Sequence, residues 1–198
     1  MQRDHQNFGW ITVICGCMFC GKTTELIRLC RLAQIAREKV LVFKHCIDTR
    51  YSVTDLASHD DSKLEAIPIQ QSTEIFRILE ARGQPDVIAI DEAQFFGSPN
   101  DSFVETILAL SKMGIRIIVA GLDQDFRGLP FGPMPNLLAV AHEVKKLQAI
   151  CVNCHGTATM TQRLVSGQPA FWDDPLEEVG GSEMYEARCS DCHEVRRR

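Results

Sequence analysis

The sequence predicts an α/β fold, in which a parallel sheet carries helices on both faces and a small metal-binding module follows. Short β-branched apolar segments alternate with segments of helical periodicity from residue 10 to residue 120. These apolar segments lack a polar face, which is typical of strands buried on both sides. Right-handed crossover connections then place consecutive strands parallel in one sheet. Two Cys-x-x-Cys pairs after residue 150 indicate the separate module.

The expected elements follow in order along the chain. Ser72 is a candidate N-cap, and Gly83 and Gly114 are candidate stops for the second and third helices. The polar, aperiodic segment 45–62 is expected to be a long functional loop. The strands are predicted at 10–15, 40–43, 86–90 and 115–120, and the helices at 22–37, 72–82 and 102–113.

Composition changes near residue 150. The segment 169–182 is polar and rich in glycine, and no segment beyond residue 150 has a convincing helical pattern. We therefore expect an α/β domain over residues 1–148 and a zinc-binding module over residues 149–198.

Length and charge exclude several classes of protein. The chain has 198 residues, 45% of them hydrophobic and 24% charged, which suits a globular domain with a small appendage and excludes general disorder. A net charge of -5 argues against non-specific nucleic-acid binding. The terminal Arg196, Arg197 and Arg198 are expected to be solvated. No apolar run is long enough to span a membrane and no secretory signal is recognisable, so we expect a cytoplasmic protein without a membrane partner.

Nine cysteines is a high number for such a protein. In a reducing compartment the first five are expected to be small, partly buried apolar residues. They are Cys15, Cys17, Cys20, Cys30 and Cys46.

The segment after the first strand fits the pattern Gly-x-x-x-x-Gly-Lys-Ser/Thr and opens a predicted helix. Glycines let backbone N–H groups surround phosphates at a helix N-terminus. Lys22 would reach the β- and γ-phosphates, and the Thr23 hydroxyl would bind Mg²⁺. The sequence therefore predicts a P-loop NTPase-like sheet with a nucleoside triphosphate site. The loop residues assigned to the phosphates are Gly16, Cys17, Met18, Phe19, Cys20, Gly21, Lys22 and Thr23.

Two carboxylates end the predicted strand 86–90. A P-loop requires a carboxylate at the end of a neighbouring strand to hold Mg²⁺, and Asp91 is placed to supply it. Glu92 is then a second carboxylate near the γ-phosphate, suited to accept a proton from an attacking hydroxyl or water.

The last four cysteines form two knuckles, Cys151-x-x-Cys154 and Cys189-x-x-Cys192. Four thiolates give the closed tetrahedral site of structural zinc. Two redox-active Cys-x-x-Cys pairs are the rival interpretation, which the absence of a βα turn at either pair disfavours. His155 and His193 follow the knuckles and are expected to be neighbours of the metal rather than ligands.

Together these motifs resemble the type II thymidine kinases, the cytosolic enzymes of nucleotide salvage. The resemblance runs from about Gly9 to Cys192. Cys20 stands where the family usually has a small residue such as serine, and Ala93 stands where some members have glycine. The segments that carry it are Gly16–Thr23, Asp48–Ser52, Ser58–Asp60, Asp91–Phe96, Gly121–Gly128, Val179–Tyr185 and the paired knuckles.

The resemblance implies transfer of the ATP γ-phosphoryl group to the 5′-hydroxyl of thymidine or deoxyuridine, with Glu92 as general base. It implies a flexible lasso between the knuckles that closes over the nucleoside. It further implies a homotetramer, bound zinc, Mg²⁺ and feedback inhibition by dTTP. To the ATP or phosphate site it adds Thr24, Asp48, Arg50 and Gln94. To the nucleoside site it assigns Met18, Phe95, Leu122, Phe126, Thr161, Tyr185 and the backbone of Val179, Gly180 and Gly181.

Two other functions fit parts of the same pattern. In a P-loop ATPase or molecular switch with a structural zinc site, Glu92 would activate water, and ATP consumption would not depend on a deoxynucleoside. A zinc ribbon that recognises nucleic acid would need a basic, aromatic face. The acidic residues between the knuckles, among them Asp173, Asp174, Glu177 and Glu178, argue against the second alternative.

Overall fold

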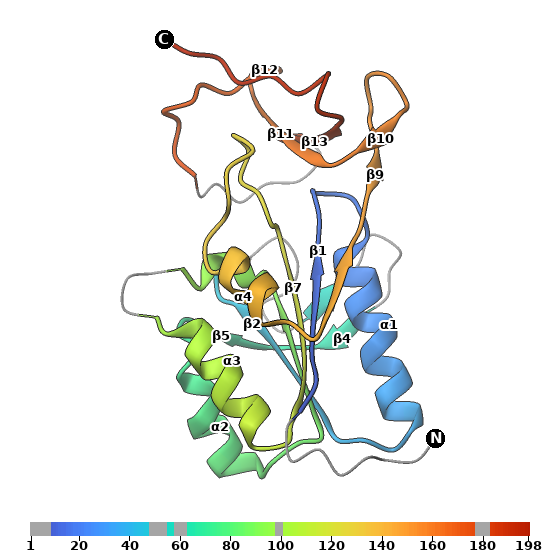
Figure 1. Ribbon diagram of the computed structural model, residues 1–198, viewed down its shortest axis with the longest axis vertical. Coiled ribbons are helices and arrows are strands. Elements are labelled where there is room, and N and C mark those ends of the chain that lie inside the picture. The colour runs from blue at the N-terminus through green and yellow to red at the C-terminus, as the bar shows by residue number, and fades with distance from the viewer. Residues whose placement is uncertain (1–8, 48–54, 58–62, 98–100, 177–182) are drawn as a thin grey trace.

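The computed structural model describes residues 9–47, 55–57, 63–97, 101–176 and 183–198. At its centre is a sheet of six strands in the order β5-β2-β6-β7-β1-β8 (Figure 1). Every adjacent pair in this sheet is parallel, which confirms the predicted fold class. The strands are β1 (Ile11–Cys15), β2 (Val40–His45), β5 (Ile67–Ile69), β6 (Val87–Asp91), β7 (Arg116–Gly121) and β8 (Glu143–Lys146).

Helices cover both faces of the sheet. Figure 1 shows α1 (Lys22–Ile35) on one side of the strands, and α2 (Glu74–Arg82), α3 (Phe103–Lys112) and α4 (Met134–Val140) on the other. The core is accordingly divided into two layers. Leu26, Ile27 and Cys30 of α1 pack in one cluster, whereas the buried side chains of α2, α3 and α4 pack in another.

The central strands β1, β2, β6 and β7 are apolar over most of their length because each of them contributes to both layers. On β6, Val87 and Ala89 belong to the α1 layer, and Ile88 and Ile90 to the opposite layer. Alternate side chains of a strand point to opposite faces of the sheet. When both faces are covered, nearly every position of a central strand is buried and is therefore apolar. This explains why the central strands were recognisable as continuous apolar runs.

Three elements of this layer structure were not predicted: β5, β8 and α4. The strand β8 has the sequence Glu-Val-Lys-Lys and lies at an edge of the sheet, where charged side chains reach solvent. The strand β5 is only three residues long and contains Pro68. The segment expected to be one long loop also contains β3 (Asp55–Ala57), which pairs with β4 (Lys63–Glu65).

The prediction that Ser72 caps α2 is wrong. The structure begins that helix after Thr73, and neither residue caps it with its side chain. The Ser72 hydroxyl is buried and hydrogen-bonds to Asp101 and to Thr106 Oγ1. Glu74 Oε1 instead accepts hydrogen bonds from the backbone N–H groups of Gln70 and Gln71, both at 2.8 Å. Gly83 and Gly114 follow the helix ends as expected, with φ of 75° and 82°.

The chain after β8 forms small antiparallel sheets beyond the carboxyl ends of the central strands (Figure 1). The pair β9 (Ala149–Ile150) and β10 (Thr157–Ala158) forms one of them, and β11 (Met160–Val165) lies between β12 (Gln168–Pro169) and β13 (Tyr185–Arg188) in the other. No helix occurs in the described parts of residues 149–198. The division into two domains near residue 148 stays a prediction.

The terminal arginines are not simply solvated, contrary to expectation. The backbone of Arg196 pairs with that of Phe171, and its guanidinium lies 4.1 Å from the centre of the Phe171 ring. The Arg197 guanidinium lies 5.2 Å from the Trp172 ring. The C-terminal residues therefore cover the two aromatic side chains that follow β12. Within the described residues, no helix is long and apolar enough to cross a bilayer.

Candidate active site

The P-loop connects the end of β1 to the start of α1, and both of its glycines have a positive φ. Gly16 has φ of 135°, and a Cβ there would lie 2.3 Å from the Leu147 carbonyl oxygen. Gly21 has φ of 86° and precedes the helix. Left-handed backbone of this kind turns successive N–H groups toward one point, which makes an anion-binding concavity. The predicted strand–loop–helix context of the motif is therefore present.

Lys22 bends back over this loop. Its Nζ donates a hydrogen bond to the Cys17 carbonyl oxygen at 2.8 Å and lies 3.9 Å from Cys20 Sγ. A hydrogen bond from the Cys17 thiol and the charge of Lys22 lower the pKa of Cys20 to about 6. The same thiol–thiol hydrogen bond, together with burial, raises the pKa of Cys17. Of the five early cysteines, Cys15, Cys17 and Cys30 are buried as expected, whereas Cys46 is exposed.

The Thr23 hydroxyl donates a hydrogen bond to Asp91 Oδ2 at 2.8 Å. The strand that carries Asp91 is not adjacent to β1, because β7 lies between β1 and β6. Asp91 is 4% exposed, and burial and the nearby charge of Glu92 raise its pKa to about 7. A hydroxyl and a carboxylate are the hard oxygen ligands that Mg²⁺ prefers. These two side chains therefore fit a bound Mg²⁺ ion.

Glu92 adopts a left-handed backbone conformation, with φ of 55° and ψ of 40°. This conformation is uncommon for a residue with a side chain, and such residues cluster at functional sites. Gln94 Nε2 donates a hydrogen bond to Glu92 Oε2 at 2.5 Å, while Gln94 Oε1 accepts one from the Leu122 backbone N–H at 2.9 Å. The buried Gln94 amide thus connects the Glu92 carboxylate to the residue that follows β7.

The four knuckle cysteines come together as predicted. Their sulfurs all lie within 4.8 Å of one another, and Cys154 Sγ is 3.6 Å from Cys189 Sγ. A zinc ion bound to four sulfurs at about 2.3 Å holds them about 3.8 Å apart, so this cluster fits zinc. Burial raises the pKa of Cys151, but backbone N–H groups of Cys154, Cys189 and Asn153 outweigh it and lower that pKa to about 6. His155 and His193, which follow the two knuckles, do not belong to this cluster.

Two contacts join the P-loop to the chain between the knuckles. The Met18 backbone N–H donates to Thr161 Oγ1 at 3.0 Å, and Cys17 Sγ lies 3.5 Å from the Ala158 carbonyl oxygen. Met18 and Thr161 were both assigned to the nucleoside site, and the structure brings them into direct contact. This contact places β11 against the P-loop.

Phe126 is 4% exposed and lies between two arginines, with Arg127 5.9 Å and Arg163 5.4 Å from its ring centre. His193 Nε2 is 2.9 Å from the Phe126 carbonyl oxygen. Because His193 directly follows Cys192, this contact links the second knuckle to Phe126. Sequence reasoning placed His193 beside the metal but did not anticipate this contact.

The structure also describes three other residues that were assigned to the site, Phe95, Tyr185 and Thr24. Phe95 contacts the rings of His45 and Phe131, at 6.0 Å and 5.9 Å between ring centres. Tyr185 is buried opposite Arg163 in the β11–β13 register, and Thr24 lies in the first turn of α1. Asp48, Arg50, Val179, Gly180 and Gly181 lie outside the described residues.

Lys44 is a candidate functional residue that sequence reasoning missed. It is 1% exposed and lies opposite Asp91 in the β2–β6 register. Register partners point to the same face of a sheet, so Lys44 brings a positive charge to the sheet edge that carries Asp91. A lysine directly after the apolar run Val40–Phe43, inside the predicted sheet, was the available signal, because burying an ammonium group is costly unless it has a charged partner.

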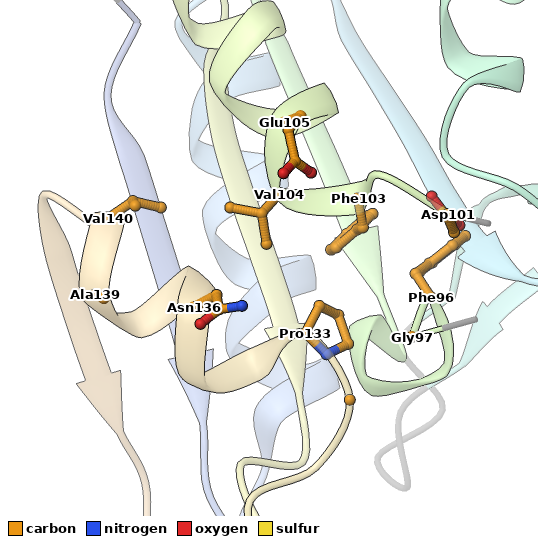
Figure 2. Close-up of a pocket in the computed structure, with 11 residues that line it drawn as sticks. Phe96, Gly97, Asp101, Phe103, Val104, Glu105, Pro133, Asn136, Ala139 and Val140 are labelled. Atoms are coloured by element: carbon orange, nitrogen blue, oxygen red, sulfur yellow. The ribbon is translucent and has the colours of Figure 1, made fainter. Parts of the chain in front are cut away.

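A separate cavity of about 520 Å³ lies between α3, α4 and the residues after the short 3₁₀ helix η1 (Ala93–Phe95). Figure 2 shows Phe96, Phe103 and Pro133 on one side of it and Asn136 on α4. Its lining includes none of the residues assigned to the nucleotide or the nucleoside. Of its two carboxylates, Asp101 already accepts hydrogen bonds from Ser72 and Glu105 is exposed, so this cavity is not part of the candidate site.

Comparison with known proteins agrees with the motifs. One solved structure, described as "Structure of the genome packaging NTPase B204 from Sulfolobus turreted icosahedral virus 2 in complex with ATP-gammaS", is 16% identical to this chain. The two structures match over 73% of this chain and 77% of that chain, with a TM-score of 0.47. This likeness is too distant to bear on function. The thymidine kinase family profile matches residues 9–193. The chain therefore belongs to the thymidine kinase family.

Proposed function

We propose that this protein transfers the γ-phosphoryl group of ATP to the 5′-hydroxyl of thymidine or deoxyuridine. The observation that carries the proposal is the arrangement at the end of β6, where Gln94 holds the Glu92 carboxylate beside the Asp91–Thr23 pair. A general base, a metal-binding carboxylate and a phosphate loop then meet at one edge of a parallel sheet, where ligands of this fold bind. Membership of the thymidine kinase family supports the choice of substrate.

The phosphate side of the site is built by the P-loop. Its backbone N–H groups and Lys22 would bind the phosphates and orient the γ-phosphoryl group. Thr23 and Asp91 would hold Mg²⁺, which neutralises charge on the phosphate oxygens when bound. Lys22 contributes positive charge that is already positioned over the loop by the Cys17 carbonyl group.

Glu92 is proposed to take the proton of the 5′-hydroxyl as its oxygen attacks phosphorus. The hydrogen bond from Gln94 fixes the orientation of the carboxylate, and the Leu122 backbone N–H fixes Gln94 in turn. A base held in one orientation before the reaction loses no entropy when the substrate arrives. In this proposal Gln94 is a positioning residue.

The nucleoside would lie between the P-loop and the chain after β10. Phe126, Leu122 and Phe95 would surround the base, and Met18, Thr161 and Tyr185 would close the pocket from the other side. Excluding water from such a pocket protects the phosphoryl group from hydrolysis. Asp48, Arg50 and the backbone of Val179, Gly180 and Gly181 remain predicted members of the site.

The four cysteines are proposed to hold a structural zinc ion that anchors both ends of the segment 155–188. Fixing the ends of a segment reduces the entropy that it loses when it closes over a ligand. The homotetramer, feedback inhibition by dTTP and the cytoplasmic location stay predictions.

Steady-state ATP consumption tests the proposal. We expect consumption to be slow with ATP and Mg²⁺ alone and to rise strongly on addition of thymidine. A rate that is the same with and without a deoxynucleoside would contradict the kinase function and favour a P-loop ATPase or switch.

A further inference from the structure

Cys17 and Cys20 form a vicinal pair of thiols inside the P-loop. They are the first and fourth residues of a turn in which Phe19 has φ of 63°. The Cα atoms at the ends of a four-residue turn lie less than about 7 Å apart, which includes the range that a disulfide bond can join.

The two thiols differ in exposure and in their neighbours. Cys20 is partly exposed, and its sulfur lies 3.9 Å from the ammonium group of Lys22. A nearby cation stabilises a thiolate, which is the reactive form of cysteine. Cys17 is 3% exposed and has its sulfur 3.5 Å from the Ala158 carbonyl oxygen. Cys20 therefore has the surroundings of an attacking thiol, and Cys17 has those of a resolving thiol.

The other cysteines lack this combination. Cys15 and Cys30 are buried in the core clusters, and Cys46 is exposed but does not belong to a pair. The four knuckle cysteines form the metal cluster. No assigned function of the P-loop uses either Cys17 or Cys20 through its sulfur.

We propose that Cys17 and Cys20 are a redox modification site, at which exchange with a small-molecule disulfide forms a reversible Cys17–Cys20 disulfide that weakens phosphate binding by the P-loop. The proposed consequence rests on the proposed function, because it assumes that the loop binds the phosphates of ATP. Formation of the disulfide does not depend on that assumption.

The exchange has two steps. The Cys20 thiolate attacks one sulfur of the small disulfide, forms a mixed disulfide and expels one thiolate. Cys17 then gives up its proton and attacks Cys20 Sγ, which expels the second thiolate and closes the Cys17–Cys20 bond. The two protein thiols lose two electrons and two protons, and the small disulfide is reduced to two thiols. Excess dithiol reductant reverses both steps.

Closing this bond would change the phosphate site in three ways. It draws the ends of the turn together, and so reorients the peptide N–H groups of Phe19 and Cys20, which the proposed function assigns to the phosphates. It removes the Cys17 proton and with it the contact to Ala158. It also moves the Cys17 carbonyl group that holds Lys22 Nζ. We expect affinity for a phosphate ligand to fall by at least about tenfold, as on loss of one charge-assisted hydrogen bond.

The test uses the full-length, zinc-loaded protein treated with oxidised glutathione. Peptide mapping is expected to find a Cys17–Cys20 bond, with an intact mass lower by two hydrogen atoms. Pyrophosphate is the binding probe, measured by calorimetry before oxidation, after oxidation and after dithiothreitol. Zinc content is measured in the same samples and is expected to stay constant. Weakened pyrophosphate binding that dithiothreitol restores would support the proposal.

Cys20→Ser and Cys17→Ser serve as test variants, and Cys46→Ser is the matched control. The pyrophosphate affinity of each oxidised variant is compared with that of the same variant in its reduced form. A change that the substitution itself makes to the affinity therefore does not affect the comparison. The ratio of oxidised to reduced affinity should be near one for Cys20→Ser and Cys17→Ser and should keep its wild-type value for Cys46→Ser. If Cys17→Ser does not fold, Cys20→Ser carries the comparison.

Two results would overturn the proposal. One is oxidation that stops at a mixed disulfide or releases zinc without joining Cys17 to Cys20. The other is a Cys17–Cys20 bond that leaves pyrophosphate affinity unchanged. Neither readout requires thymidine, so a failure of the proposed kinase activity would remain distinguishable from a failure of this inference.

Discussion

At the scale of single residues, Glu92 combines a constrained backbone with a constrained side chain. Its backbone is left-handed, and Gln94 Nε2 donates a hydrogen bond to one oxygen of its carboxylate at 2.5 Å. Left-handed conformations of residues other than glycine are maintained only where surrounding contacts over-determine them. The contacts of Gln94 with Glu92 and Leu122 provide such support.

Replacing Glu92 with glutamine should lower kcat by about 10²–10⁴-fold, the range for a positioned general base. The new amide oxygen can still accept the hydrogen bond from Gln94 Nε2, so the geometry is kept while basicity is lost. Thymidine binding, measured by calorimetry, should stay close to that of the wild type. Glu105→Gln, an exposed carboxylate at the separate cavity, is the control. A Glu92→Gln enzyme with more than half the wild-type kcat would remove Glu92 from the mechanism.

Lys22→Ala should weaken ATP binding by about 10- to 100-fold, because a hydrogen bond to a charged group contributes ~1.5–3 kcal/mol. Thymidine should still bind, since Lys22 contacts only P-loop atoms, namely the Cys17 carbonyl oxygen and Cys20 Sγ, among the hydrogen bonds described for it. Calorimetry with each ligand alone checks both statements. Lys112→Ala, at the exposed end of α3, should bind ATP normally. Unchanged ATP affinity in Lys22→Ala would contradict the assigned role.

Sequence alone could single out Lys22, Thr23, Asp91 and Glu92 as candidate site residues, because the P-loop pattern and the carboxylates at a strand end depend on residue type at fixed spacing. It could not identify the contacts that orient them. The Gln94–Leu122 hydrogen bond joins residues 28 positions apart, and the His193–Phe126 contact joins residues 67 positions apart. Such pairs depend on strand order and on the path of the chain after β8, which local patterns do not encode.

At the scale of elements, the most predictable segments were those buried on both faces or amphipathic over several turns. The strands β1, β2, β6 and β7 and the helices α1, α2 and α3 carry such patterns. The strands β5 and β8 lie at the two edges of the sheet, where one side meets solvent and the apolar pattern is weak. The helix α4 has seven residues, with Pro133 before it and Pro135 within its first turn, too short for a periodic signal.

The zinc knuckles are the elements whose loss should affect nucleoside binding most. Cys189→Ser should release zinc, because serine is a poor zinc ligand near neutral pH. The second knuckle would then no longer fix His193 against Phe126 or anchor β13, which carries Tyr185. We expect KM for thymidine to rise by a larger factor than Kd for ATP, with both measured alongside zinc content on one preparation.

The exposed Cys46 provides the matched control, because Cys46→Ser removes a thiol outside the knuckles. It should keep zinc, and its KM for thymidine should equal that of the wild type. Loss of zinc in Cys189→Ser with an unchanged KM for thymidine would show that the metal does not support the nucleoside site.

At the scale of the whole molecule, the site is assembled from two parts of the chain that are distant in sequence. The carboxyl ends of the parallel strands supply the P-loop, Asp91 and Glu92, and the chain after β8 supplies Thr161 and Tyr185. The Met18–Thr161 hydrogen bond joins them, 143 positions apart. In the proposed function this contact would bring the phosphate and nucleoside sites together, an arrangement that favours direct transfer between two bound substrates over hydrolysis of one.

The most direct measurement is the fate of the labelled γ-phosphoryl group of ATP offered with thymidine, deoxyuridine and deoxycytidine in turn. The account predicts transfer to thymidine and to deoxyuridine, which lacks only a methyl group worth about 1 kcal/mol. Deoxycytidine should be a poor acceptor, because its Watson–Crick edge would leave buried groups unpaired at about 1–3 kcal/mol each. Label released as inorganic phosphate at the same rate with or without a nucleoside, or equal kcat/KM for deoxycytidine and thymidine, would contradict it.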